Sequence, residues 1–199
     1  MNDTIRILER KIVWKKFIRV EELVVEQDLP DGRTIRLGRE VHDHGAAAAI
    51  LLYDPARSVV VLVRQFRTGA HMAGGPSYLL EIPAGLLDGD APGEAISREA
   101  MEETGYFVGE TRHLFDFFAS PGTLTEKVAL FVAFVSATDR VSEGGGLEDE
   151  HEFIEVVELP LYEAFKMIES GSIIDAKTIM ALQWAMLNRQ TLEEAHFPA

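Results

Sequence analysis

The sequence has no cysteine among its 199 residues. Disulfide bonds and thiolate metal sites are therefore excluded, and any bound metal must be held by oxygen or nitrogen atoms. A chain without thiols is compatible with the reducing cytoplasm, which is the location we expect for this protein.

Two further absences limit the partners. No apolar run reaches 18 residues, so no membrane span is expected, and the mixed charge of residues 1–14 is not typical of a signal peptide. Basic residues are a minority, with 19 Lys and Arg against 33 Asp and Glu and a net charge of −14. This balance argues against a nucleic-acid surface. It is compatible with a small phosphate-bearing substrate, because a bound divalent metal inverts the local field.

The first 43 residues differ from the rest of the chain. Residues 17–25 and 33–41 predict two strands, joined by the strong turn signal LPDG at residues 29–32. Residues 1–43 are therefore expected to form an N-terminal β-hairpin arm. A lone hairpin is marginally stable in water, so the arm must pack on the main domain or on another subunit.

Residues 44–199 predict one α+β domain rather than a doubly wound parallel sheet, because one central helix and two final helices interrupt a β-rich order. Asp90 or Ala91 should begin the central helix, with Pro92 in its first turn. Loops are expected at 71–77, 120–122 and 142–152. Residues 46–52 form a small apolar run. Strands are expected at 59–63, 78–82, 113–119, 128–135 and 155–159, and helices at 91–104, 161–170 and 175–189.

The most informative segment is residues 98–106, which read REAMEETGY. Residues three or four apart share a helix face, so Glu99 and Glu103 lie on one face with Glu102 beside them. These acids precede Gly105, a predicted helix end, where the helix dipole disfavours each anion by roughly 0.3–1 kcal/mol. A bound cation would offset this penalty, and ligands that are all oxygen suit Mg²⁺ or Mn²⁺. The alternative is the solvated acidic face of a surface helix.

The order of residue types resembles the Nudix box, G-x5-E-x7-R-E-U-x-E-E-x-G-U, in which U is a bulky apolar residue. Residues 98–106 match its last nine positions, with Ala100 and Tyr106 as loose matches to U. The first half departs from the pattern, because Asp90 replaces the first Glu and Gly85 precedes it by five positions rather than six. We interpret Asp90 as the helix N-cap rather than a metal ligand. Arg98 is expected to orient the Glu carboxylates through bidentate hydrogen bonds.

A second acidic segment, EDEHE at residues 148–152, follows three glycines. Taken alone, such a run is most simply a solvated loop. Hydrolysis of a diphosphate, however, needs a group that deprotonates or orients water, and Nudix hydrolases often take this carboxylate from a loop after the box. Glu150 is the first choice, ahead of Glu148, Asp149 and Glu152.

Cationic ligands for a diphosphate are harder to identify. Arg39, Arg64 and Arg67 are candidates, although each taken singly is most simply surface charge. Arg67 follows a buried strand at the mouth of a loop, which favours a function, whereas Lys177 in the last helix is a weak candidate on sequence alone.

The resemblance extends over nearly the whole chain and points to the GDP-mannose pyrophosphatase branch of the Nudix superfamily, which is close to the ADP-ribose pyrophosphatases. The shortened loop of the box is shared with that branch. The segments that carry the likeness are 39–41, 51–53, 63–67, 84–88, 120–122, 144–146 and 148–150.

This resemblance implies an α/β/α Nudix sandwich with a mixed sheet and a homodimer with exchanged N-terminal arms. It implies Mg²⁺, or alternatively Mn²⁺, held by the Ala84 carbonyl and the carboxylates of Glu99, Glu103 and Glu150. The catalytic residues would be Glu103, Glu150, Glu102 and Arg98. The implied substrate contacts within one subunit are Arg67, the backbone of Ala84, Gly85 and Leu86, and the side chains of Glu126, Asp149 and Lys177. Phe17 would stack on the base. Three further residues, Gly38, Arg39 and Glu40, would contact the substrate from the partner subunit.

The expected reaction is metal-dependent hydrolysis of a nucleotide sugar, with GDP-mannose giving GMP and mannose 1-phosphate. The main alternative is ADP-ribose, giving AMP and ribose 5-phosphate, because Pro121 follows Gly105 by sixteen residues, a spacing associated with ADP-ribose hydrolases. A remote alternative is a non-catalytic Nudix-like binding module. Such modules tend to lose the box glutamates, but Glu99, Glu102 and Glu103 are all present.

Overall fold

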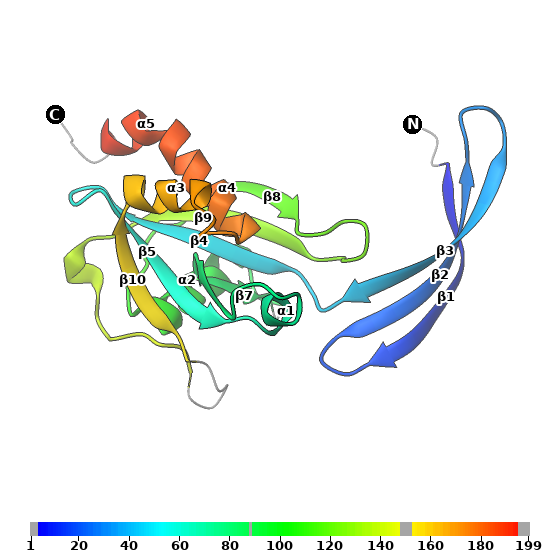
Figure 1. Ribbon diagram of the computed structural model, residues 1–199, viewed down its shortest axis with the longest axis horizontal. Helices are drawn as coiled ribbons and strands as arrows, with labels where there is room; N and C mark the ends of the chain where they lie inside the picture. The colour runs from blue at the N-terminus through cyan, green and yellow to red at the C-terminus, as the bar shows by residue number, and fades with distance from the viewer. Residues whose placement is uncertain (1–3, 88, 148–152, 195–199) are drawn as a thin grey trace. The chain divides into compact units, whose positions relative to one another are not determined.

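The computed structural model describes residues 4–87, 89–147 and 153–194. Two compact units divide the chain, one made of residues up to 46 together with 118–127, and the other of residues 47–117 and those from 128 onward (Figure 1).

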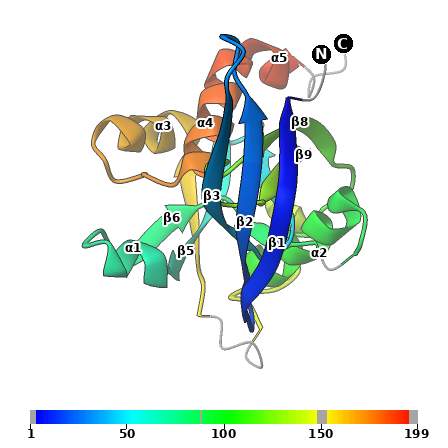
Figure 2. The same ribbon diagram turned by 90° about the vertical axis from the view of Figure 1, so that its right-hand side faces the viewer.

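The N-terminal unit is built on a three-stranded antiparallel sheet (Figure 2). Its strands are β1 (Ile5–Lys15), β2 (Arg19–Asp28) and β3 (Thr34–Asp43), in that spatial order. The expected hairpin is β2–β3, whereas β1 was not predicted. Register shifts between Ile7 and Glu9 and between Ile12 and Trp14 break the two-residue alternation that identifies a strand in sequence.

The second unit contains a seven-stranded mixed sheet of order β10-β5-β4-β9-β8, with β6 paired to β5 and β7 paired to β4. The β4–β9 pair is parallel, while β5 pairs with β4, β6 and β10 in antiparallel register. The strands are β4 (Ala47–Asp54), β5 (Val59–Phe66), β6 (Tyr78–Glu81), β7 (Ala84–Leu86), β8 (Arg112–Phe118), β9 (Lys127–Phe134) and β10 (Glu155–Pro160).

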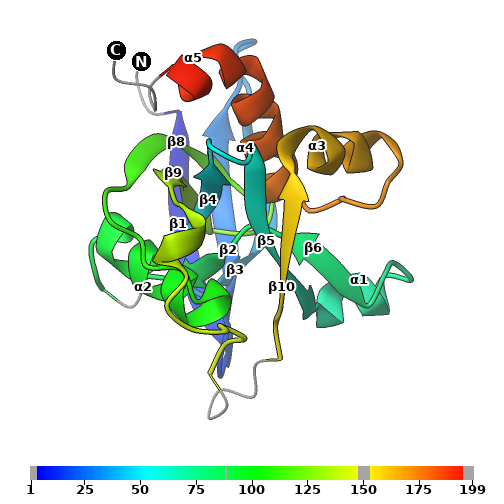
Figure 3. The same cartoon turned by 90° about the vertical axis from the view of Figure 1, so that its left-hand side faces the viewer.

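Helices cover both faces of this sheet, and β4 is therefore buried on both sides along its whole length. Residues 47, 49, 51 and 53 pack with α3 (Leu161–Glu169), α4 (Ala176–Leu187) and Leu192 of α5 (Arg189–Glu194). Residues 48, 50 and 52 pack with Ile96 and Ala100 of α2 (Pro92–Thr104) on the opposite face (Figure 3). The predicted α+β class and α/β/α sandwich are confirmed.

Several local predictions need correction. The expected loop at 71–77 overlaps a short helix, α1 (Thr68–Met72), and a 3-10 turn occupies Ala137–Asp139. The last predicted helix ends at Leu187, and α5 follows it after Asn188. Within the described ranges, no helix is both long and apolar enough to cross a membrane.

Candidate active site at the end of the acidic helix

Helix α2 carries its acids at different depths. Glu103 lies on the buried face and is only 3% exposed, whereas Glu102 is partly exposed and 25% of the Glu99 side chain is accessible. Glu99 and Glu103 are one helical turn apart, as the sequence predicts. A carboxylate buried near a helix C-terminus is electrostatically unfavourable unless a positive charge or hydrogen-bond donors compensate it.

Gly85 on β7 makes room for the Glu99 carboxylate. A Cβ atom on residue 85 would lie 2.5 Å from Cδ and 2.7 Å from Oε2 of Glu99, far inside normal contact distance. Glycine therefore lets the carboxylate lie directly against the backbone of β7, next to Ala84 and Leu86. Any larger residue would displace it.

The glycine-rich segment 144–146 packs against the C-terminal end of α2. The backbone N–H of Gly145 donates to the Glu103 carbonyl at 2.9 Å, and that of Gly146 donates to the Glu102 carbonyl at 3.2 Å. Gly144 has a φ of +71°, and a Cβ there would lie 2.5–2.7 Å from backbone atoms of residues 103–105. These donors satisfy carbonyls that a helix end leaves without intrahelical partners, and only glycine fits the contact.

Of the two residues expected to begin α2, Ala91 does so and Asp90 does not, and Arg98 does not hold a Glu carboxylate in bidentate fashion. The N-cap position belongs to Ala91, which makes no side-chain cap bond. Asp90 instead accepts a hydrogen bond from Nη1 of Arg98 at 2.8 Å, because it lies one residue before the cap and opposite the guanidinium. Arg98 reaches Glu99 through one longer bond of 3.4 Å from Nη2, so it spans two carboxylates rather than gripping one in bidentate fashion.

A buried carboxylate that the sequence reasoning missed, Glu81, gathers two of the predicted substrate ligands. Glu81 ends β6 and is 1% exposed. Arg67, at the N-cap of α1, donates to Oε1 at 2.9 Å and to Oε2 at 2.8 Å. Lys177, in the first turn of α4, donates to the same Oε2 at 2.5 Å and to Asp175 at 3.0 Å. A signal existed in the sequence, since a single acid in the apolar stretch YLLEI needs a charged partner when buried.

The charges of this cluster support one another. Burial alone would raise the pKa of Glu81, but the hydrogen bonds from Arg67 and the charge of Lys177 outweigh it, so the pKa lies below its usual value. Burial likewise opposes the charge of Arg67, yet its hydrogen bonds to Glu81 and the negative charges of Glu81, Glu103 and Asp175 raise its pKa. The guanidinium is therefore within electrostatic reach of the acidic helix end.

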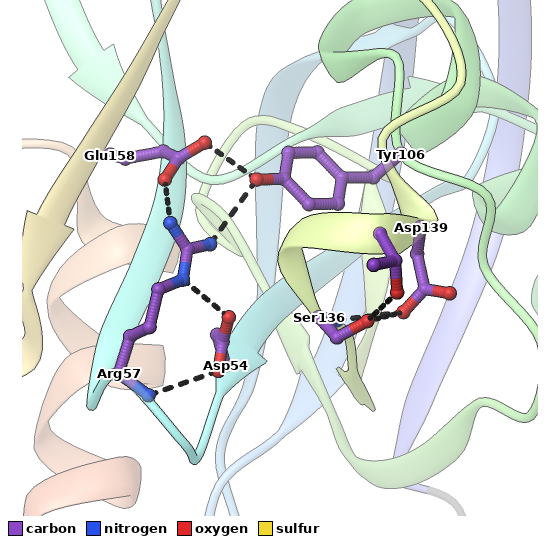
Figure 4. A network of polar contacts seen from close by, with 7 residues as sticks. Asp54, Arg57, Tyr106, Ser136, Asp139 and Glu158 are labelled. Atoms are coloured by element: carbon purple, nitrogen blue, oxygen red, sulfur yellow. Dashed lines mark hydrogen bonds and ion pairs between the residues drawn. The ribbon is translucent and has the colours of Figure 1, made fainter.

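A second carboxylate cluster forms at the far end of β5, around Glu158 of β10 (Figure 4). Arg57 donates to Glu158 at 2.6 Å, and the hydroxyl of Tyr106 donates to it at 2.5 Å. Arg57 also contacts Tyr106 at 3.4 Å and Asp54 at 2.5 Å. Burial and the bond to Glu158 raise the pKa of Tyr106, so its hydroxyl stays protonated and keeps donating. The last residue of the box is thus fixed to the sheet.

The remaining predicted ligands are distributed as follows. Asp149 and Glu150 lie outside the described residues. In the N-terminal unit, Arg39 donates to its neighbour Gly38, and Glu126 lies 3.3 Å from His44. The roles predicted for residues of that unit stay predictions, and they are Phe17, Gly38, Arg39, Glu40 and Glu126.

A divalent metal fits the residues at the end of α2. Mg²⁺ at phosphate sites is commonly held by one or two carboxylates, with waters and substrate phosphates completing its shell. Glu99 and Glu103 would supply two such carboxylates, and the predicted third ligand, the Ala84 carbonyl, precedes Gly85, which leaves the space that the Glu99 carboxylate fills. No group of three or more His, Asp or Glu side chains with metal-binding geometry occurs in the described part of the chain.

Residues 43–182 match the NUDIX domain model, and the chain belongs to the Nudix family. It is 42% identical over 189 residues to proteins named GDP-mannose pyrophosphatase from Escherichia coli O1:K1 / APEC and Shigella dysenteriae serotype 1 (strain Sd197), with 94% of this chain and 98% of each relative covered. The crystal structure of an ADP compounds hydrolase has the same fold, with a TM-score of 0.72, 23% identity and coverage of 98% of this chain and 97% of that one. The predicted family and enzyme class, a Nudix hydrolase, are confirmed.

Proposed function

We propose that the protein hydrolyses the diphosphate of a nucleotide sugar, and that GDP-mannose is its substrate. The observation that carries this proposal is the 42% identity to GDP-mannose pyrophosphatases across 94% of the chain. The site supports it, because a buried acidic helix end and a two-cation cluster lie within electrostatic reach of each other. Such a combination suits a substrate with two adjacent phosphates and a metal.

The proposed division of labour follows from the chemistry of each group. Arg67 and Lys177 bind the diphosphate, while Glu99, Glu103, the Ala84 carbonyl and Glu150 hold Mg²⁺, with Mn²⁺ as the alternative. The metal, when bound, neutralises phosphate charge and makes water more acidic.

The reaction itself is a substitution at phosphorus. Glu150 accepts a proton from the attacking water, and Glu102 assists at the same helix end. A new bond forms between the water oxygen and one phosphorus as the bond to the bridging oxygen breaks. The products are GMP and mannose 1-phosphate. Arg98 holds Glu99 in place through its 3.4 Å contact.

A homodimer is part of the proposal. Six large apolar side chains of β1 are exposed, a property that edge strands usually avoid unless another chain covers them. They are Ile5, Ile7, Leu8, Ile12, Val13 and Trp14. An exchanged arm would cover them and bring Phe17, Arg39, Glu40 and the backbone of Gly38 to the partner's site. Sedimentation as a monomer at micromolar concentration would contradict this part.

ADP-ribose is the second candidate substrate, because Pro121 follows Gly105 at the spacing associated with ADP-ribose hydrolases. The test is a panel of GDP-mannose, ADP-ribose, other nucleotide sugars and dinucleoside polyphosphates, each incubated with Mg²⁺ and analysed for monophosphate products. We expect GDP-mannose to have the highest kcat/KM. Faster turnover of ADP-ribose would transfer the assignment to that substrate, and no turnover of any compound would refute a hydrolase.

A further inference from the structure

Glu81 accepts hydrogen bonds from two cationic side chains that are far apart in the sequence. Arg67 follows β5 and Lys177 opens α4, yet Nη2 of Arg67 and Nζ of Lys177 bind the same oxygen, Oε2, at 2.8 and 2.5 Å. Two cations so close repel each other unless an anion lies between them. The buried Glu81 carboxylate is that anion, and its fork with the guanidinium also fixes the plane of Arg67.

Both cations keep hydrogen-bond donors for another acceptor. The bonds to Glu81 engage Nε and Nη2 of Arg67, and the Nη1 donors have no acceptor among the residues that the structure describes. Lys177 uses two of its three donors on Glu81 and Asp175. Glu81 is 1% exposed, but 39% of the Arg67 side chain is accessible. The carboxylate is therefore buried, and the guanidinium reaches the surface with donors available.

Hydrogen bonds connect the elements that carry this cluster. The N-cap Asp175 accepts from the backbone N–H of Thr178 at 3.0 Å and from its hydroxyl at 2.6 Å. That hydroxyl in turn accepts from the backbone N–H of Ile82 at 2.9 Å, the residue after Glu81. The start of α4 is thereby tied to the end of β6, which places Lys177 beside Glu81.

We propose that Glu81 is a positioning residue that presents Arg67 and Lys177 as one preformed pair of cations to the diphosphate of the substrate. The inference rests on the proposed function for the identity of the substrate. It adds that the spacing and orientation of the two cations are set by a carboxylate that does not touch the substrate.

The test compares Glu81→Gln with the matched control Glu158→Gln. Each variant replaces a carboxylate that accepts from an Arg and a second donor, but Glu158 belongs to the cluster around Tyr106. Calorimetry with imidodiphosphate, a diphosphate whose bridge resists hydrolysis, measures binding in the presence of Mg²⁺. Steady-state assays with GDP-mannose separate KM from kcat, and thermal unfolding reports stability.

We expect Glu81→Gln to weaken imidodiphosphate binding by about tenfold or more and to raise KM more than it lowers kcat. At metal sites, loss of a residue that orients a ligating side chain commonly lowers affinity or activity about 10–100-fold, and we expect a similar effect here. Glu158→Gln should lower Tm and leave binding and KM unchanged. If Glu81→Gln does not fold, Glu81→Asp retains the charge but is one methylene shorter. This shorter carboxylate cannot reach both cations, so binding should still weaken.

The proposal is overturned if the folded variant binds imidodiphosphate as the wild type does while Tm falls. It is also overturned if the wild type fails to bind the probe. A protein that binds imidodiphosphate in a Glu81-dependent manner but does not hydrolyse GDP-mannose would refute the proposed substrate and support the positioning role.

Discussion

The two carboxylate clusters of the Nudix domain are alike in composition and differ in what they leave unused. Glu81 and Glu158 each accept from an arginine and one further donor, and each has a pKa below the usual range although burial opposes ionisation. In the Glu158 cluster, every nitrogen of the Arg57 guanidinium has an acceptor, because Nε, Nη1 and Nη2 donate to Asp54, Glu158 and Tyr106. In the Glu81 cluster, Nη1 of Arg67 has no acceptor within the described part of the chain, and Lys177 uses two of its three donors.

This difference separates a structural network from a binding surface. A guanidinium whose three nitrogens all have acceptors within the protein is less available to a ligand, so the Glu158 cluster fixes the end of the box to the sheet. A cluster with surplus donors and a buried counter-ion is already organised before a ligand arrives. Composition alone would not distinguish the two.

The largest effect, on kcat, is expected from a substitution at the C-terminal end of α2. Glu103→Gln removes a buried carboxylate proposed to hold the metal, and we expect kcat to fall on the order of a thousandfold, because a catalytic metal contributes several kcal/mol. Glu94→Gln, in the exposed first turn of the same helix, is the matched control and should retain activity. Near-normal kcat for the folded Glu103 variant would refute the metal assignment.

A smaller but still large effect is expected from the loss of Glu81 on stability. Glu81→Gln leaves two cations without their buried partner, and we expect a decrease of about 3 kcal/mol, the low end for a buried pair because Arg67 is partly exposed. The folded pKa is lowered, so this contribution is complete above the usual value of 4.5 and is lost as pH falls through the lowered pKa.

Urea unfolding of wild type and Glu81→Gln at several pH values measures this difference directly. The gap in free energy of unfolding should be constant from pH 6 to 8 and should shrink below 4.5. A gap that widens in acid would contradict an ionised Glu81 in the folded protein.

The contact between the glycine-rich segment and α2 should be sensitive to a single methyl group. Gly144→Ala places a Cβ against the backbone of residues 103–105 at a positive φ, and we expect a loss of about 1–3 kcal/mol in stability together with reduced kcat. Gly109→Ala is the control, because a Cβ there meets no atom within 4 Å. If the two variants have equal stability and equal kcat, the segment 144–146 can shift to accept the methyl group without disturbing the C-terminal end of α2.

Parts of the fold that depend on local pattern could be predicted from the sequence. The helix around Glu99 and Glu103 follows from its start signal at Pro92 and its end at Gly105, and β5 follows from a continuous apolar run. The apolar run expected at 46–52 is the strand β4. The strand β1 could not be predicted, because its bulges remove the alternation that defines a strand. The helix α1, which overlaps the loop expected at 71–77, is only five residues long, too short for a helical period to be visible.

The site was harder to predict for a different physical reason. Glu81, Arg67 and Lys177 lie on three separate elements, so their shared oxygen is a property of tertiary packing and not of spacing. The same holds for Gly144, whose need for glycine arises from a helix end far away in sequence. Asp90 was expected to cap its own helix, but the long side chain of Arg98 offered a closer partner.

The smallest effect is expected from a substitution in the Glu158 cluster. Tyr106→Phe removes the hydroxyl that donates to Glu158 and leaves the ring in the core, so we expect a loss of about 1–2 kcal/mol in the free energy of unfolding. KM for the nucleotide sugar and the affinity for imidodiphosphate should equal those of the wild type, because the hydroxyl contacts no proposed substrate ligand. Chemical denaturation and calorimetry measure the two quantities on the same sample. A change in diphosphate affinity without a change in stability would show that the Glu158 cluster also serves the site, and the contrast between the two clusters would then fail.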